Sequence, residues 1–415
     1  MQVPNVEDTS LIISSEPLDM SSKTTKLLHY FKTGGNVLCP IQDQSVMKAV
    51  RGICFQSQST YDKFWVKQSS SWINPKSSPY QDLLTSQFKQ FCTVTEKVPK
   101  LSKAVIWPNV ETVPEKIVQQ TKLLLDFNEA SKEPTDTYLP IVPASTSSST
   151  FNFQDYANEL KTDTLGQTVI HAEVVNSTFD ILEGPMVHNG LVVIADQQIQ
   201  GRGRGNNTWI SPLGCAMTSF QLRFNVKSSQ GQKASLLQHL VSLAVVTCID
   251  TIPLKLKWPN DIYYSKIKMG GVVVLSSVFK DVMVFNIGLG FNLDNAKPTL
   301  SLNALLENEN ERKLSRESYF ARLFNTIEKY LQLLETPQGL ESLLNLYHQH
   351  WLHQDQVVSL IQDDLDSKVD GVVKCIDEFG YIVVQLEDGT RVSVQPGTNS
   401  FDMMQGLILP KRMKI

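Results

Sequence analysis

GRGRGNNTW, residues Gly201–Trp209, is the stretch from which the fold and chemistry of this sequence are most readily inferred. Three glycines alternate with two arginines after a β-rich run, Leu191–Ala195. Glycine lets the backbone approach a ligand, consecutive N–H groups form an anion-binding concavity, and arginine adds forked donors. The segment therefore suits the crowded charge of a nucleotide phosphate, although a mobile RG-rich loop that touches RNA is an alternative. It is not the dinucleotide fingerprint, which needs GxGxxG between a strand and a helix.

KWPND, residues Lys257–Asp261, is the second motif. Proline forces an extended residue before it and favours a turn around it. We therefore expect a rigid turn that presents Lys257, Asn260 and Asp261. A strand-end turn with a packed Trp258 explains the motif equally well.

Lys268 stands directly before Met269-Gly270-Gly271 and a run that reads as a buried strand. A lysine that enters a core strand is costly unless its charge has a partner, which points to an anionic ligand. The alternative is a surface lysine whose ammonium reaches solvent. Downstream, Gly288-Leu289-Gly290-Phe291-Asn292 forms a GxGxN strand end, which is a weak signal alone.

The pattern around these motifs mixes strands and helices without regular βαβ alternation, which favours an α+β fold. Helical periodicity predicts amphipathic helices at 235–249 and 316–335, the second with Ser315 as its N-cap. Apolar β-rich runs predict strands at 169–175, 191–195, 271–275 and 282–288. In the tail, short strands separated by turn residues suggest a small SH3-like barrel, at 357–361, 371–377, 381–386 and 391–394.

These patterns divide the chain into five parts. The stretch 128–150 is rich in Pro, Ser and Thr, and we expect a linker there because it cannot bury enough surface to offset its ordering entropy. The other parts are a disordered N-terminus at 1–23, a small or incomplete α/β region at 24–127, a catalytic domain at 151–355 and the SH3-like domain at 356–415.

Composition restricts the class of protein. The formal net charge is -4 and the pI about 6.0, which disfavours a general nucleic-acid binder. Six cysteines lack CxxC pairing, which argues against a structural zinc site and a disulfide framework. The sequence contains no run of 18 apolar residues, so we expect no membrane span. The first ten residues lack the pattern of a targeting segment. We therefore expect a cytoplasmic protein.

The order of the motifs is more specific than any one of them. GRGR with Trp209 five residues after Arg204, then KWPND, Lys-x-Gly-Gly-Val and GxGxN, resembles the biotin–protein ligase family, known in eukaryotes as holocarboxylase synthetase. The resemblance covers about residues 165–415, and the tail at 399–403 and 407–412 looks like the eukaryotic branch. It implies a class II synthetase-like mixed sheet, with residues 24–127 similar to the end of an upstream glutaminase-like domain.

The resemblance also implies site residues. Three are expected to be catalytic: Lys268, Arg204 and Arg202. The biotin site would comprise Ser177, Thr178, Gln198, Gly201, Arg202, Arg204, Lys268, Gly270, Gly288 and Gly290. The ATP site would comprise Gly203, Gly205, Trp209, Lys257, Asn260 and Asn292. Phe179 stands where bacterial members have asparagine. No separate protein metal site is expected, because Mg²⁺ accompanies ATP.

The implied reaction joins the biotin carboxylate to the α-phosphate of ATP and then passes biotin to a lysine of a biotin-dependent apo-carboxylase. Neither step needs a side-chain nucleophile, which fits a sequence without a recognisable Ser-His-Asp or Cys-His arrangement. A lipoate or octanoyl ligase is the nearest alternative, and a catalytically silent regulatory module is another. Bacterial relatives can bind DNA through an N-terminal winged helix, but residues 1–150 show no basic recognition-helix pattern.

Overall fold

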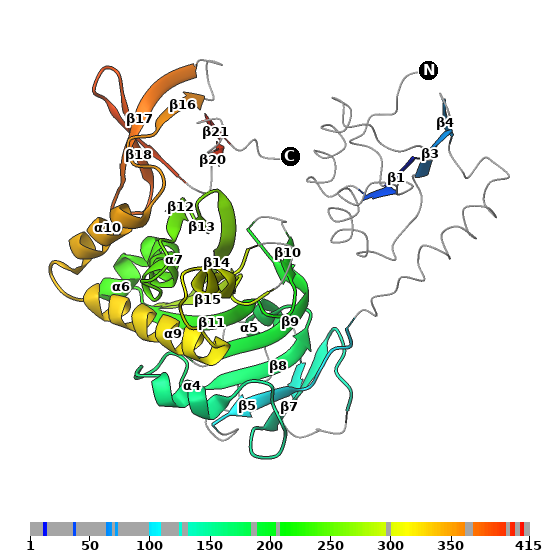
Figure 1. The fold of residues 1–415 in the computed structure, drawn as a ribbon. Coiled ribbons are helices and arrows are strands. Elements are labelled where there is room, and N and C mark those ends of the chain that lie inside the picture. Colours follow the sequence, from blue (N-terminus) through cyan, green and yellow to red (C-terminus); the bar gives the residue numbers. More distant parts are fainter. Residues whose placement is uncertain are drawn as a thin grey trace. The chain divides into compact units, whose positions relative to one another are not determined.

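The computed structural model divides into two compact units, Met1–Val98 and Pro99–Ile415 (Figure 1). In the first unit the structure describes strands at 11–14, 36–38, 64–68 and 71–73. In the second it describes residues 99–108, 124–126, 132–183, 189–204, 208–295, 300–361, 368–395, 399–402 and 407–410.

The first unit contains a four-stranded sheet of order β2-β1-β3-β4. β1 (Leu11–Ser14) pairs in parallel with β2 (Asn36–Leu38) and β3 (Phe64–Gln68), and β4 (Ser71–Ile73) is antiparallel to β3. β1 falls within residues 1–23, for which we expected no structure.

A mixed sheet of eleven described strands forms the frame of the second unit. Along the sheet the order is β12-β13-β14-β15-β11-β9-β8-β5-β7-β6, and β10 pairs with β9. Neighbours from β12 to β9 are antiparallel, as are β8 and β5, whereas β9/β8, β5/β7 and β7/β6 are parallel. The α+β expectation is therefore confirmed. The strands are β5 (Ala104–Trp107), β6 (Leu124–Asp126), β7 (Tyr138–Pro143), β8 (Val169–Val175), β9 (Val192–Arg202), β10 (Thr208–Ser211), β11 (Ala216–Asn225), β12 (Lys255–Lys257), β13 (Asp261–Tyr264), β14 (Ile267–Phe279) and β15 (Val282–Phe291).

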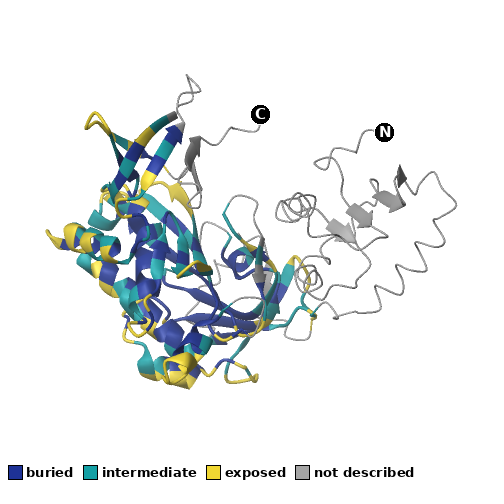
Figure 2. Ribbon diagram, turned by 45° about the horizontal axis from the view of Figure 1, so that its top comes forward, coloured by how far each residue is buried: buried dark blue, intermediate teal, exposed yellow. Residues whose placement is uncertain are grey.

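Helices cover the sheet where the sequence has apolar stripes at helical spacing. α7 (Leu237–Thr247) and α9 (Arg316–Leu333) match the two predicted helices, and Ser315 caps α9 by accepting from Ser318 N. Phe320, Phe324 and Ile327 of α9 are fully buried against the sheet. Figure 2 shows this buried layer in dark blue between strands and helices. The other helices are α4 (Phe153–Glu159), α5 (Thr178–Leu182), α6 (Ser229–Gln232), the short 3₁₀ turn η5 (Ala234–Leu236), α8 (Leu302–Asn308) and α10 (Gly339–His350).

The predicted linker differs from the structure. β7 lies within 128–150, yet Leu139 and Ile141 are buried in a second apolar cluster with Ala104 and Ile106 of β5. Pairing with β5 satisfies the backbone, and burial of alternate apolar side chains offsets the ordering entropy. That gain depends on a distant strand, so local composition could not show it.

Asp196 of β9 fastens the end of the same segment to the sheet. Its carboxylate accepts from Thr150 Oγ1, pairs with Arg316, and lies 2.8 Å from Nε2 of His171. Burial raises the pKa of Asp196. The hydrogen bond and charge of His171 and the charge of Arg316 outweigh this effect, so that the pKa of Asp196 is about 2. Ser149 Oγ lies 2.9 Å from the other ring nitrogen of His171.

The tail forms a separate six-stranded sheet of order β19-β18-β17-β16-β21-β20. Its neighbours are antiparallel except β16 and β21, and the four predicted strands are confirmed within a few residues. Gly380 and Gly389 occupy the turns with φ of +80° and +84°. In the described part of the chain, no helix is long and apolar enough to cross a membrane. The strands are β16 (Val357–Ile361), β17 (Lys368–Ile376), β18 (Ile382–Leu386), β19 (Arg391–Val394), β20 (Asn399–Asp402) and β21 (Leu407–Pro410).

Candidate active site

A compact polar group surrounds Gln198 near the end of β9. Its Oε1 accepts from the backbone N–H of Thr178 at 2.8 Å and lies 3.1 Å from Thr178 Oγ1 and 3.4 Å from Ser177 Oγ. Its Nε2 donates to Ser211 Oγ at 3.1 Å, and Thr178 Oγ1 lies 2.8 Å from Ser219 Oγ. Ser177 also caps α5, because its Oγ accepts from the backbone N–H of Phe179 at 3.3 Å. The predicted biotin residues Ser177, Thr178 and Gln198 are thus brought together.

Gly201 is a close-packed point at the start of the GRGR segment, residues Gly201–Arg204. A Cβ added there would lie 2.6 Å from the carbonyl oxygen of Trp209 on β10 and 3.2 Å from Nε2 of Gln198. A side chain at this position would therefore push β10 from β9 and disturb the amide of Gln198. The requirement for glycine here comes from strand pairing as well as from any ligand.

Arg204 reaches across to the KWPND turn, residues Lys257–Asp261. Its Nη1 donates to Oδ1 of Asn260 at 3.2 Å. Burial lowers the pKa of Arg204, while the nearby charge of Asp261 raises it. Gly203 precedes this arginine, and Gly205 lies outside the described residues.

Arg202 points elsewhere. Its Nη2 lies 2.5 Å from Oδ1 of Asp180 and 3.1 Å from Oε2 of Glu183, both at α5. We expected the Arg202 guanidinium to bind a phosphate. It instead forms charge-assisted pairs with two carboxylates of the protein. The only trace of this pairing in the sequence is weak and distant from Arg202: two acids, Asp180 and Glu183, flank the apolar residues Ile181 and Leu182.

The KWPND turn is held on both sides. Trp258 is 2% exposed, its peptide bond to Pro259 is cis, and the Pro259 carbonyl accepts from Gln238 of α7 at 3.0 Å. The Asn260 amide donates to the Val272 carbonyl at 2.8 Å. The structural interpretation of the motif, a turn with a packed tryptophan, is therefore right, and the turn also presents Asn260 and Asp261.

Lys268 finds its anion within the protein. Its Nζ lies 2.7 Å from Oδ1 of Asp261 and 5.7 Å from the ring centroid of Trp209. Its side chain is 40% exposed, so the ammonium stays within reach of a ligand. Lys257 lies over a different ring: its Nζ is 5.8 Å from the ring centroid of Tyr263, not of Trp209.

At Gly290, the GxGxN end of β15 packs against the ring of Trp209. A Cβ at Gly290 would lie 2.5 Å from Nε1 of that tryptophan, and one at Gly270 would lie 2.7 Å from the Gly290 carbonyl. Asn292 follows and is 5% exposed, and its Nδ2 lies 3.5 Å from the Lys268 carbonyl. Bare backbone is therefore necessary where β14 and β15 pass under the tryptophan.

Gly288 meets the other part of the site. A Cβ there would lie 3.0 Å from the ring of Phe179, which is 4% exposed at the start of α5. Gly288 pairs in register with Ser219, a member of the polar group around Gln198. β15 thus connects the Gln198 group, through Ser219, with Trp209, through Gly290.

Contacts in the structure join the GRGR segment and Trp209 to the KWPND, Lys268 and GxGxN motifs, which lie later in the sequence and follow one another along β13, β14 and β15. Arg204 contacts Asn260, Lys268 contacts Asp261 and lies over Trp209, and Trp209 packs on Gly290. The partners of these groups were not among the expected site residues, although Asp261 was expected on the KWPND turn; they are Asp180, Glu183, Ser211, Ser219 and Asp261.

The chain is similar in sequence to proteins of one family. Residues 171–292 match the model of the Biotin/lipoate A/B protein ligase family. The human "Biotin--protein ligase" is 38% identical over 299 residues, which cover 68% of this chain and 41% of the human protein. A solved structure, "Biotin protein ligase from Aquifex aeolicus in complex with biotin and ATP", is 24% identical, with a TM-score of 0.46 over 59% of this chain and 99% of that chain.

The relative from Arabidopsis thaliana, "Biotin--protein ligase 2", is 33% identical over 282 residues. The match covers 63% of this chain and 83% of that relative, so it extends well beyond the region of the family model. The chain therefore belongs to the biotin–protein ligase family.

Proposed function

We propose that this protein activates biotin with ATP to biotinyl-5′-AMP and then transfers the biotin to a specific lysine of an apo-carboxylase. One observation carries the proposal: the GRGR segment and Trp209 meet the KWPND turn, Lys268 and Gly290, all much later in the sequence, through Arg204–Asn260, Lys268–Trp209 and Trp209–Gly290 contacts. A surface loop and an unrelated turn would have no reason to converge in this way.

We propose that biotin lies beside the polar group around Gln198. A buried cluster of hydroxyl and amide groups suits a ureido ring, which both donates and accepts hydrogen bonds. The rest of the ligand is proposed to lie along β14 and β15, where Gly288 passes close to the ring of Phe179 and Gly290 to that of Trp209. The proposed biotin contacts are Ser177, Thr178, Gln198, Gly201, Gly270, Gly288 and Gly290, with Arg204 and Lys268 at the carboxylate.

The nucleotide is proposed to lie beside Trp209, whose ring offers a flat apolar surface. Gly203, Gly205, Lys257, Asn260 and Asn292 complete the proposed ATP site. Lys268 is the favoured catalytic residue, because its ammonium is half-exposed and already faces an anion. For Arg202 we propose a supporting role, in which its pairs with α5 hold the GRGR segment.

The chemistry is a displacement in which the biotin carboxylate oxygen bonds to the α-phosphorus and pyrophosphate leaves. The acceptor lysine amine then attacks the acyl carbon, and AMP leaves. The protein has to position the reactants and offset charge on phosphate oxygens. One fixed cation at such a charge is worth about 3 kcal/mol, or on the order of 10² in rate. Lys268 and Arg204 are proposed to supply these cations.

Mg²⁺ prefers oxygen ligands and usually keeps several from water and phosphate. Within the described residues, no group of three or more His, Cys, Asp or Glu side chains could hold a metal. Two neutral amide oxygens lie near Lys268: Oδ1 of Asn260, which accepts from Arg204, and Oδ1 of Asn292, which lies 3.6 Å from Cys215 Sγ. We therefore propose that Mg²⁺ enters with ATP beside these two residues.

The proposal extends to partners and architecture. The acceptors would be biotin carboxyl carrier domains, and neither a membrane nor a nucleic acid is proposed as a partner. The compartment proposed is the cytosol, because scattered cysteines are typical of reducing conditions. We also propose that the large sheet is class II synthetase-like and that the tail sheet closes as an SH3-like barrel.

Biotin-dependent pyrophosphate release tests the activation step directly. The full chain is incubated with MgATP and either biotin, lipoate or octanoate, and pyrophosphate is measured. Release that requires biotin supports the proposal. Release with lipoate or octanoate alone would favour a ligase for those acids, and no release with any acid would contradict an activating enzyme.

A further inference from the structure

The segment that follows α10 runs beside β12 and so meets the KWPND turn. Trp351 forms a parallel bridge with Leu256, and the Leu352 backbone N–H donates to the Leu256 carbonyl at 2.9 Å. This pairing brings His353 to the turn, although it lies 95 residues after Trp258 in the sequence.

His353 is completely buried and accepts a hydrogen bond from the turn. Its Nε2 lies 3.0 Å from the backbone nitrogen of Trp258, and its Nδ1 lies 3.0 Å from Oε1 of Gln356. A backbone N–H can only donate, so Nε2 carries no proton and Nδ1–H donates to Gln356. Burial lowers the pKa of His353 to about 4, the Gln356 hydrogen bond raises it and the Lys257 charge lowers it, so the ring is neutral at pH 7.

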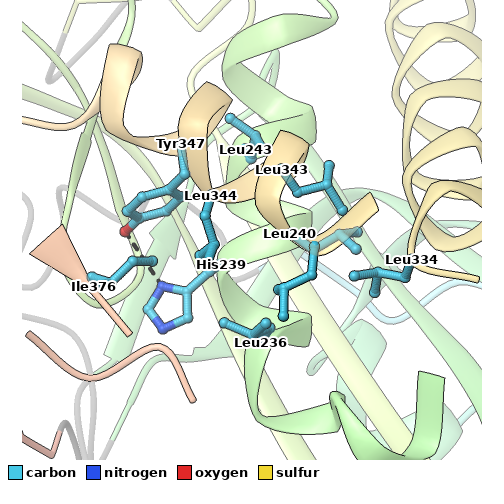
Figure 3. A pocket seen from close by; sticks show the side chains of 10 residues that line it. Leu236, His239, Leu240, Leu243, Leu334, Leu343, Leu344, Tyr347 and Ile376 are labelled. Atoms are coloured by element: carbon cyan, nitrogen blue, oxygen red, sulfur yellow. Dashed lines mark hydrogen bonds between the residues drawn. The ribbon is translucent and has the colours of Figure 1, made fainter. Parts of the chain in front are cut away.

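Besides the backbone contact with His353, Trp258 contacts the C-terminal sheet through its side chain. Its Nε1 donates at 2.9 Å to the carbonyl of Gly380, in the turn between β17 and β18. A Cβ at Gly380 would lie 2.4 Å from the ring of His239 on α7. Figure 3 shows His239 beside Tyr347 of α10 and Ile376 of β17, in the small apolar pocket where these elements meet. The C-terminal sheet therefore packs on α7 and α10 through contacts that do not involve His353.

The backbone N–H of Trp258 lies two residues before the groups that face the site. Asn260 contacts Arg204 and the Val272 carbonyl, and Asp261 pairs with Lys268. A buried N–H without an acceptor is costly, so loss of Nε2 would make the turn shift toward another partner. Such a shift would move Asn260 and Asp261 and leave the distant group around Gln198 in place.

We propose that His353 is a positioning residue for the nucleotide: its Nε2 fixes the backbone of the KWPND turn and thereby the placement of Asn260 and Asp261. The inference rests on the function proposed above. His353 itself touches neither reactant, so its removal weakens ATP binding more than biotin binding, because the polar group around Gln198 stays in place.

Two amide substitutions separate the two ring contacts. The amide of His353→Gln reaches the place of Nε2 and offers an acceptor to Trp258, whereas that of His353→Asn reaches only the place of Nδ1 and keeps Gln356. Pyrophosphate release by the full chain gives the KM for MgATP and for biotin. For His353→Asn we expect the KM for MgATP to rise about tenfold with biotin KM within about twofold, and for His353→Gln both within about threefold.

His348, at the end of α10, provides the control, because its ring also accepts from a backbone N–H at 3.0 Å. Its Nε2 accepts from Ile376 of β17 at 3.0 Å and does not touch the turn. His348→Ala should leave the KM for MgATP within about twofold of wild type. An equal rise in both variants would assign the effect to loosening of the C-terminal sheet and overturn the proposal.

The remaining outcomes are also decisive. If His353→Gln and His353→Asn behave alike, Nε2 has no special role and the proposal is wrong. Should His353→Asn not fold, His353→Gln decides alone, since an ATP KM near wild type supports the proposal and a tenfold rise overturns it. A wild-type protein that releases no pyrophosphate would instead count against the proposed function.

Discussion

Replacing Lys268 with alanine should separate activity from stability. The ion pair of Lys268 with Asp261 is 2.7 Å long, but the lysine side chain is 40% exposed, so its loss should lower the free energy of unfolding by only about 0–1 kcal/mol. The charge of Arg204 remains near Asp261 in the variant. The same change removes a cation from the proposed α-phosphate site, where about 3 kcal/mol of transition-state stabilisation corresponds to roughly a 10²-fold loss of adenylation.

Lys374 allows a matched control. Its Nζ lies 2.9 Å from Asp355 and its side chain is 37% exposed, so Lys374→Ala removes a comparable pair from the C-terminal sheet. Pyrophosphate release and thermal unfolding are measured on both variants and on Lys257→Ala, for which we expect a smaller loss of activity. Near-normal adenylation by Lys268→Ala, or an equal loss in Lys374→Ala, would refute the reasoning.

Three further predictions concern Arg204, the strands β5 and β7, and Asp196. Arg204→Ala should fold and release biotinyl-AMP early, because it loses the contact to the KWPND turn; leakage equal to wild type in a rapid-quench assay would argue against this. A fragment 99–415 should retain adenylation within about threefold, whereas 151–415 should melt much lower in calorimetry because it lacks β5 and β7; equal melting temperatures would show that these strands are dispensable. Asp196 has a folded pKa of about 2, below its unfolded value of 3.8, so its contribution is present above pH 4 and is lost as the pH falls toward 2. In urea titrations at pH 6, Asp196→Asn should therefore lower the free energy of unfolding by about 1–2 kcal/mol. Below pH 4 the free energy of unfolding of the variant should depend less on pH than that of the wild type. An unchanged free energy of unfolding at pH 6 would contradict this.

The features that the sequence predicted well are local ones. α7 and α9 were predicted from apolar spacing, since a helix places residues three and four apart on one face. The tail strands were predicted from alternation and from turns at Gly380 and Gly389. The site motifs could be identified because glycine and proline leave a conformational signature in the sequence.

What the sequence did not predict depends on partners far along the chain. Nothing near Arg202 indicates that its guanidinium meets two carboxylates of α5 rather than a phosphate. The segment 128–150 reads as a linker because the strand that buries its apolar residues lies about 35 residues earlier. Likewise His353 has no local pattern, and only the pairing of Trp351 with Leu256 brings it to the KWPND turn.

Transfer of labelled biotin to an apo biotin-carrier domain tests the central claim most directly. The full chain is incubated with labelled biotin, MgATP and two carriers, one with the acceptor lysine and one with arginine in its place. The account predicts label on the lysine carrier alone, with one AMP and one pyrophosphate formed for each biotin attached. Absence of label on the lysine carrier, or equal label on both carriers, would contradict it.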